Sequence, residues 1–195
     1  MKRVNRLRQV LAEGKIAVGT CADSYSAAVI ETIGASGLDW VRVDSEYSWR
    51  RDESMENMMR AAALAGITAM VRVEKGDPYL ISKALQSGAQ AIVVSDIASY
   101  EEALAVVKAA KYPPKGHRGY SGYCFAANWG ADGGKEWIEW SDREIMIGVM
   151  IENEAVVAEV ERDMAIEGLD FGLFGPSDYS MSLGLRGTQK DNPQV

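Results

Sequence analysis

Ionisable side chains stand at the ends of successive short apolar runs along this chain. Five are carboxylates and one is an arginine, and the apolar runs that they end are well separated along the chain. They are Asp44, Glu46, Arg72, Asp96, Glu152 and Asp178. Any single acid after a strand is most simply explained as the N-cap of the next helix. Several acids and an arginine after different strands are harder to explain by capping alone, so we interpret them as a candidate active site.

These side chains could bind a hard divalent cation, which would then take part in the chemistry. Carboxylates without a histidine or cysteine cluster suit Mg²⁺ or Mn²⁺, with Co²⁺ or Zn²⁺ as less favoured choices. Such a cation is a Lewis acid toward a carbonyl oxygen. Arg72 would add a permanently charged donor for an oxyanion or a carboxylate. Backbone N–H groups of the turn Phe174-Gly175-Pro176-Ser177-Asp178 could hold a small carboxylate.

Apolar, β-branched runs alternate with longer helical patterns, which predicts an α/β fold with parallel strands covered on both faces. The expected strands are Ile16–Thr20, Trp40–Asp44, Thr68–Val73, Ala91–Ser95, Ile145–Ile151 and Phe171–Phe174. The expected helices are an opening one ended by Gly14, then Ser26–Ser36, Ser54–Leu64, Tyr79–Gln86, Ser99–Ala110 and Glu154–Met164. In such a fold the strand ends that carry the polar residues face the same side, which is the catalytic side of a barrel.

The glycine- and aromatic-rich segment 112–143 interrupts this alternation, and a connection of such length indicates a functional loop or lid. No linker divides the chain, so we expect one domain over residues 1–195. Cys21 and Cys124 lie in no CxxC pattern and are expected to be free thiols. His117, the one histidine, is expected to be a solvated residue of the long segment.

The composition is that of a globular protein, since 47% of the 195 residues are hydrophobic and 25% are charged. A net charge of −7 argues against nucleic acid or an anionic membrane as the main partner. No segment has the length and apolar character of a signal peptide or a membrane span. We therefore expect a cytoplasmic protein that acts on a small molecule.

Several stretches together resemble the HpcH/HpaI aldolase family of metal-dependent pyruvate aldolases, within the citrate lyase β-subunit-like superfamily. They are Gly37-Leu38-Asp39-Trp40 through Glu46, Val71-Arg72-Val73 with Asp77-Pro78, Tyr112-Pro113-Pro114 through Arg118-Gly119, Ile151-Glu152, and Gly175-Pro176-Ser177-Asp178. The resemblance implies a (β/α)8 TIM barrel of the phosphoenolpyruvate/pyruvate type. It also implies a homo-oligomer, a hexamer or trimer of dimers, with active sites near subunit contacts.

The same resemblance implies roles for individual residues. Glu152 and Asp178 would be the metal ligands, and Glu46 would hold a water molecule bound to that metal. Arg72 would stabilise the enolate of pyruvate, and the backbone amides of Ser177 and Asp178 would bind its carboxylate. The implied reaction is cleavage of a 4-hydroxy-2-oxo acid to pyruvate and an aldehyde through a metal-bound enolate.

The sequence departs from the family pattern in its proton-transfer groups. Tyr47 stands where the family's aldolases usually have histidine, and Gln86 stands where the aspartate paired with that histidine is expected. Met150 replaces a glutamine that often contacts the substrate. Tyrosine has an unperturbed pKa of about 10, so it is a hydrogen-bond donor unless that pKa is strongly depressed. Proton transfer could then use metal-bound water, Glu46 or Tyr47.

Only six of the eight βα units of a closed barrel can be counted, so the domain is expected to lack its last two. The leading hypothesis is a metal-dependent carbon–carbon lyase. One alternative is a different metal-enolate reaction such as 2-oxo acid decarboxylation, which needs no base for a 4-hydroxyl group. Another is a non-catalytic barrel that binds an oxo acid.

Overall fold

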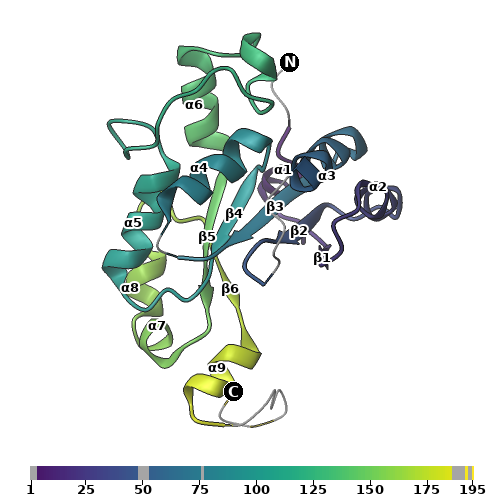
Figure 1. The fold of residues 1–195 in the computed structure, drawn as a ribbon. Coiled ribbons are helices and arrows are strands. Elements are labelled where there is room, and N and C mark those ends of the chain that lie inside the picture. The colour runs from purple at the N-terminus through teal and green to yellow at the C-terminus, as the bar shows by residue number, and fades with distance from the viewer. Residues whose placement is uncertain (1–3, 48–52, 76, 186–191, 193–194) are drawn as a thin grey trace.

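The computed structural model describes residues 4–47, 53–75, 77–185, 192 and 195. Six parallel strands form one curled sheet in the chain order β1-β2-β3-β4-β5-β6 (Figure 1). The strands are β1 (Gly19–Ala22), β2 (Trp40–Asp44), β3 (Thr68–Val73), β4 (Ala91–Val94), β5 (Met146–Ile151) and β6 (Phe171–Phe174). The helices are α1 (Arg6–Ala12), α2 (Ala27–Ala35), α3 (Glu53–Ala65), α4 (Pro78–Ser87), α5 (Tyr100–Ala110), η1 (Asn128–Gly130), α6 (Lys135–Glu144), α7 (Glu154–Ala158), α8 (Val160–Met164) and α9 (Pro176–Ser182).

The sequence-predicted α/β alternation and the six strands are confirmed, and the curled sheet is part of a TIM-like barrel. Every residue of β3 and β4 is buried, as expected of strands covered on both faces. The first strand was predicted wrongly, because Ile16 is 87% exposed and pairing begins only at Gly19, opposite Trp40. The predicted helix over 154–164 is two short helices that meet at Glu159.

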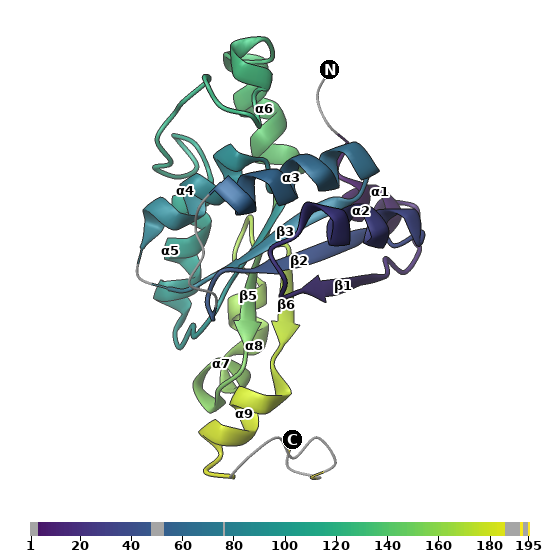
Figure 2. The same ribbon diagram turned by 45° about the vertical axis from the view of Figure 1, so that its right-hand side comes forward.

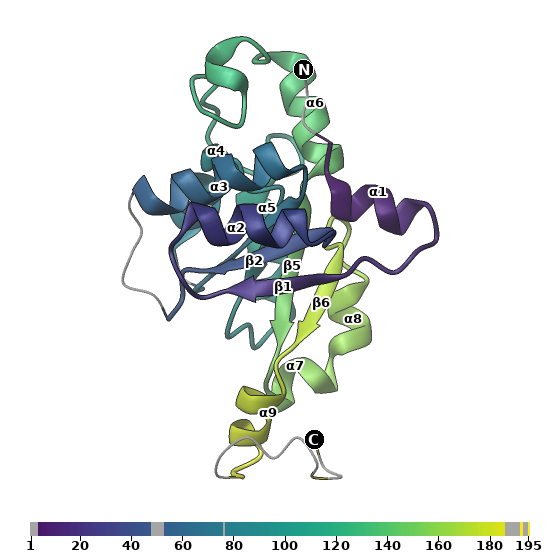
Figure 3. The ribbon, with the colours of Figure 1, turned by 90° about the vertical axis from the view of Figure 1, so that its right-hand side faces the viewer.

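Two apolar layers hold the sheet. The main core lies between the sheet and its helices, and it contains fully buried Ile30, Val71, Leu85 and Ile92. Figure 2 shows α2 and α3 lying over β1 and β2. The opposite face of the sheet carries a second cluster, in which Leu7 of α1 packs with residues of β3, β4 and β5. Figure 3 shows α1 on the side of the strands away from α3.

Local signals set the helix boundaries. The Asp77 side chain accepts a hydrogen bond from the Tyr79 backbone N–H at 2.8 Å, and Pro78 occupies the first turn of α4. Asn153 caps α7 in the same way at 3.0 Å from the Val156 nitrogen. At the other end of α4, Gly88 has φ +113°, a left-handed conformation that lets the chain turn directly into β4.

The segment 112–143 is more folded than the lid that its composition suggested. It contains η1 and most of α6, and Trp137 and Trp140 of α6 stack with ring centroids 4.9 Å apart. These two side chains form a separate apolar cluster with Cys124 and Ala127. Figures 1 to 3 place α6 at the end of the molecule opposite α9. Within the described residues, no helix has the length and hydropathy needed to span a membrane.

Candidate active site

Asp44 and Arg72 form the most firmly held pair at the strand ends. They are direct partners in the register of β2 and β3. The Asp44 carboxylate accepts from Arg72 Nε at 3.2 Å and makes a second, short contact with Nη2. Asp44 Oδ1 also accepts the Glu46 backbone N–H at 2.9 Å. The Arg72 guanidinium is therefore fixed in one orientation at the carboxyl end of β3.

Glu46 and Tyr47 complete the surroundings of this arginine. Glu46 Oε2 lies 3.1 Å from Arg72 Nη1, an ion-pair distance, although no hydrogen bond with good geometry reaches that oxygen from the described residues. The Tyr47 ring lies over the guanidinium, with the Arg72 Cζ 4.9 Å from the ring centroid. Tyr47 is 68% exposed, so it covers Arg72 from the solvent side.

Glu152 is buried at the end of β5, where two neighbouring turns hold it. Its Oε1 accepts the backbone N–H of Asp96 at 2.6 Å. Asp96 has φ +53°, a left-handed conformation that presents this N–H to the carboxylate. On the other side, a Cβ built on Gly175 would lie 2.9 Å from Glu152 Oε2, so a side chain at position 175 would displace the carboxylate. The Asp96 side chain points elsewhere and pairs with Lys75 at 3.2 Å.

Ser177 and Asp178 lie in the first turn of α9, next to Gly175. The negative charge of Asp178 acts on Glu46, Tyr47 and Glu152, and in each case it raises the pKa. The carboxylates predicted from separate strands therefore belong to one electrostatic cluster. Its members are Asp44, Glu46, Glu152 and Asp178, with Arg72 as the central cation.

The acids of this cluster differ in their affinity for protons. Burial, then the charge of Asp178, raises the pKa of Glu152, and burial also raises the pKa of Glu46. Burial acts in the same direction on Asp44, but the hydrogen bonds from Arg72 and from the backbone outweigh it, and the Asp44 pKa is lowered. Burial and the neighbouring Glu46 raise the pKa of Tyr47 above its usual 10. The direction of this shift favours the neutral hydroxyl form of Tyr47.

The residues present fit a hard divalent cation. Glu152 Oε1 is held by the Asp96 backbone N–H, and a cation would relieve the repulsion that the negative charges of Asp178 and Glu46 exert on Glu152. Two carboxylates completed by water is a common donor set for Mg²⁺. The described part of the chain contains no cluster of three or more His, Cys, Asp or Glu side chains with metal-site geometry. Glu152 and Asp178 as the protein donors remain a prediction.

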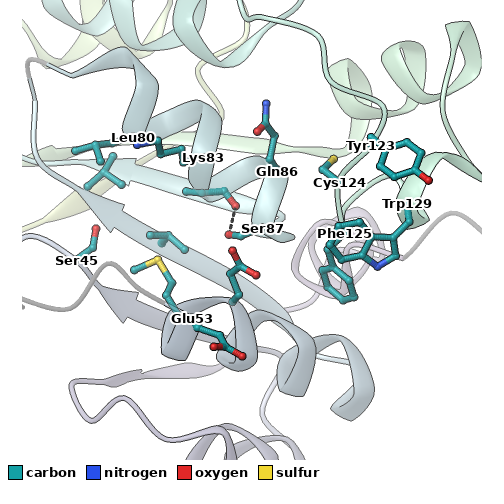
Figure 4. A pocket seen from close by; sticks show the side chains of 15 residues that line it. Ser45, Glu53, Leu80, Lys83, Gln86, Ser87, Tyr123, Cys124, Phe125 and Trp129 are labelled. Carbon is teal, nitrogen blue, oxygen red and sulfur yellow. Dashed lines mark hydrogen bonds between the residues drawn. The ribbon is translucent and has the colours of Figure 1, made fainter.

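Gln86, matched by sequence to the partner of position 47, lines a different place. It borders a cavity of about 510 Å³ between α3 and α4, and its Nε2 donates to Ser82 Oγ at 3.3 Å. Figure 4 shows Gln86 on α4, with Ser45 at one end of the cavity and Phe125 and Trp129 at the other. Tyr47 is not among the described residues that line this cavity.

Asp44 is the member of this cluster whose part was not predicted. Asp44 was recognised as a strand-end acid, yet it was not given a role; the structure makes it the anchor of Arg72. The signal was available, because an acid that ends one buried strand and an arginine at the end of the next will pair in a parallel register. The contribution of Asp96 through its backbone N–H had no sequence signal.

The sequence also matches a known protein family and several of its members. A family model described as HpcH/HpaI aldolase/citrate lyase matches residues 19–193. A hydroxypyruvate/pyruvate aldolase from Sagittula stellata is 32% identical over 191 residues, covering 98% of this chain and 74% of the relative. A 4-hydroxy-2-oxovalerate aldolase from Rhodococcus jostii is 30% identical over 196 residues, covering 98% of this chain and 73% of the relative.

Solved structures agree with these relatives. An HpcH/HpaI aldolase from Desulfitobacterium hafniense superposes with a TM-score of 0.89 at 28% identity, covering 98% of this chain and 74% of the other. The citrate synthase SbnG gives a TM-score of 0.85 at 31% identity, covering 97% and 73% of the two chains. The two structural neighbours are thus named as an aldolase and as a citrate synthase.

Proposed function

The chain belongs to the HpcH/HpaI aldolase/citrate lyase family, and from that premise we propose that it is a metal-dependent carbon–carbon lyase. Its substrate would be a 4-hydroxy-2-oxo acid, cleaved to pyruvate and an aldehyde. The observation that carries the proposal is the convergence of Arg72 with Glu46, Glu152 and Asp178 at the carboxyl ends of the strands. The aldolase names of the relatives support the same reaction class.

Arg72 is suited to bind the oxygen that becomes negative during cleavage. A guanidinium has five N–H groups. Asp44 takes two of them and Glu46 lies near a third, which leaves two for a substrate oxygen. Because Asp44 already fixes the guanidinium, little reorganisation is needed when charge develops.

Glu152 and Asp178 would hold the divalent cation, Mg²⁺ or Mn²⁺ by preference. When bound, that cation would supply Lewis acidity toward the oxygens of the oxo acid. The backbone N–H groups of Ser177 and Asp178, at the start of α9, would bind the substrate carboxylate. Glu46 would orient water between these groups and Arg72.

Proton transfer is proposed to use Glu46, with Tyr47 as a donor. The raised pKa of Glu46 brings that carboxyl closer to the operating pH, as a general base requires. The raised pKa of Tyr47 disfavours its anion, so its hydroxyl would donate a hydrogen bond to the departing aldehyde oxygen. Decarboxylation of a 2-oxo acid is the second candidate, because it needs no base to deprotonate a 4-hydroxyl group.

The first test is pyruvate consumption with a panel of aldehydes, with Mg²⁺ or Mn²⁺ and then with EDTA. Consumption that needs the metal and is lost in Arg72→Ala would support the aldolase, while Glu152→Gln should abolish it and Glu154→Gln should not. Glu154 is an exposed neighbour on α7, so it controls for loss of charge. Oxaloacetate decarboxylation without aldol activity would favour the second candidate, and absence of both would overturn the proposal.

Three expectations from the sequence remain predictions. They are a single barrel domain over residues 1–195, assembly into a homo-oligomer (a hexamer or trimer of dimers), and a cytoplasmic location. Tyr47 and Gln86 as replacements for a His–Asp pair are likewise a proposal. The separate positions of Tyr47 and Gln86 indicate that they would act independently rather than as a hydrogen-bonded pair.

A further inference from the structure

The turn that follows β4 holds Glu152 through a backbone group and not through a side chain. The Asp96 N–H donates to Glu152 Oε1 at 2.6 Å. Asp96 has φ +53°, in the left-handed region that glycine, asparagine and aspartate accept and that β-branched residues avoid. The direction of this N–H is therefore set by the backbone conformation at position 96.

A second hydrogen bond joins the turns after β4 and β5 in the opposite sense. Asn153, the residue after Glu152, donates from Nδ2 to the Ile97 carbonyl oxygen at 2.7 Å. Its Oδ1 accepts the Val156 N–H at 3.0 Å, and because a backbone N–H can only donate, this contact fixes which end of the amide faces Ile97. Ile97 is 1% exposed and belongs to the main core, so the residue that carries this acceptor is held in place. Two reciprocal hydrogen bonds thus connect the two turns.

The rest of the turn after β4 is held from α5 and from the end of β3. Glu102 Oε2 accepts the Ala98 N–H at 2.8 Å. Lys75 Nζ lies 3.2 Å from Asp96 Oδ2 and 3.5 Å from Glu102 Oε1. The Asp96 side chain is 70% exposed, and an ion pair so exposed contributes little. The side chain at position 96 therefore matters chiefly through the backbone conformation that it allows.

We propose that Asp96 and Asn153 are positioning residues for Glu152, which fix the orientation of its carboxylate for a divalent cation by joining the turns after β4 and β5. The inference rests on the proposed function, because it takes Glu152 as a metal ligand. Asp96 acts through its backbone N–H, and Asn153 acts through the Ile97 carbonyl group. A carboxylate that is already held loses less freedom when the cation binds, so metal affinity should depend on both residues.

The test of Asp96 is calorimetric titration of the metal-free full chain with Mn²⁺. Asp96→Asn and Asp96→Gly lose the negative charge but still accept a left-handed backbone, so they should keep nearly the affinity of the unchanged protein. Asp96→Val disfavours that backbone and should weaken Mn²⁺ binding about tenfold, the lower range for a group that orients a metal ligand. Asn128→Val is the matched control, because Asn128 is exposed and has φ +50° in η1, and it should leave Mn²⁺ affinity unchanged.

Asn153→Ser tests the second hydrogen bond and keeps the test decisive if Asp96→Val does not fold. Serine can still cap α7, so urea denaturation in EDTA should show nearly unchanged stability. It lacks the amide donor to Ile97, so the Mn²⁺ affinity should fall about tenfold. Asp77→Ser makes a comparable change at the N-cap of α4 and should leave the Mn²⁺ affinity unchanged.

Three outcomes would contradict the proposal. If Asp96→Asn and Asp96→Gly lose as much affinity as Asp96→Val, the effect belongs to the charge and not to the turn. If Asp96→Val or Asn153→Ser binds Mn²⁺ as the unchanged protein does, while Glu152→Gln lowers the affinity, the role of that residue is overturned and the proposed function stands. Absence of saturable Mn²⁺ binding to the unchanged protein would overturn the inference and the proposed metal dependence together.

Discussion

Asp44 and Arg72 face each other at matched positions of β2 and β3, and the carboxylate contacts both Nε and Nη2 of the guanidinium. Both side chains are almost fully buried, at 10% and 8% exposure. A pair held by two contacts and by strand register is rigid, so it positions the remaining N–H groups of Arg72.

Asp44→Asn should lower stability and activity together. The amide keeps the shape of the side chain but gives Arg72 one charge-assisted acceptor fewer, which costs about 1.5–3 kcal/mol. Urea denaturation measures that loss, and steady-state kinetics should show a lower kcat with a smaller change in KM. Glu56→Gln is the control, because the exposed Glu56–Arg60 pair on α3 contributes little. Equal effects of the two variants would contradict a special role for Asp44.

Tyr47→Phe separates the ring from the hydroxyl group. The phenylalanine ring can still lie over Arg72, so folding stability should be nearly unchanged. If the hydroxyl donates a hydrogen bond to the aldehyde oxygen, kcat should fall by about 10²-fold, the lower range for loss of one donor to an oxygen that develops charge. Tyr79→Phe, at an exposed position on α4, controls for loss of a tyrosine hydroxyl elsewhere. Full activity in Tyr47→Phe would contradict a role of the Tyr47 hydroxyl in the reaction.

Gly175→Ala should weaken metal binding without removing any ligand. The new methyl group would lie 2.9 Å from both Cβ and Oε2 of Glu152 and 3.1 Å from the Cε of Met150. The carboxylate must then shift away from its position at the end of β5. Calorimetric titration with Mn²⁺ should show that Gly175→Ala has a lower affinity for the metal than the unchanged protein. Gly119→Ala is the matched control, since nothing lies within 4 Å of its added Cβ.

Asp163→Asn should stabilise the protein at neutral pH and not in acid. Asp163 is 2% exposed, its Oδ1 has no hydrogen-bond partner among the described residues, and burial raises its pKa. A carboxyl whose pKa is raised by folding contributes stability below its unfolded pKa of about 3.9, and that contribution is lost as pH rises through the folded value.

The asparagine does not titrate, so the advantage of the variant should grow between about pH 4 and about pH 7. Urea denaturation of both proteins across that range measures the difference. Glu161→Gln on the same helix, at an exposed position, should show no such dependence. A constant difference at all pH values would mean that the buried carboxylate is compensated.

The spacing of apolar residues, and the glycines, acids and turns between the apolar runs, predicted most of the fold. β2, β3 and β6 begin and end where the apolar runs do, because these runs are bounded by glycines, acids or turns. The first strand was misplaced because Ile16 and Val18 look like a buried run, although α1 and the sheet edge leave both exposed. Apolar character alone does not reveal which side chains the fold covers.

The sequence predicted which residues gather at the strand ends, but not the directions in which their side chains point. Strand-end position predicted that Arg72 and Glu152 would approach the other acids, since parallel strands share one carboxyl edge. The sequence could not reveal that Tyr47 covers Arg72 while Gln86 turns into a cavity between helices. Those directions depend on how the chain leaves β2 at Tyr47 and on how α4 packs, which are tertiary properties.

The strict chain order of the six strands has a consequence for how the protein is made. Each strand pairs with the one synthesised just before it, and no later strand must insert between two that are already paired. Strand–helix units that emerge from the ribosome can therefore dock one after another. The long segment between β4 and β5 would delay the docking of β5. Asp44 and Arg72 would meet early in that order, before Glu152 and Asp178 have been synthesised.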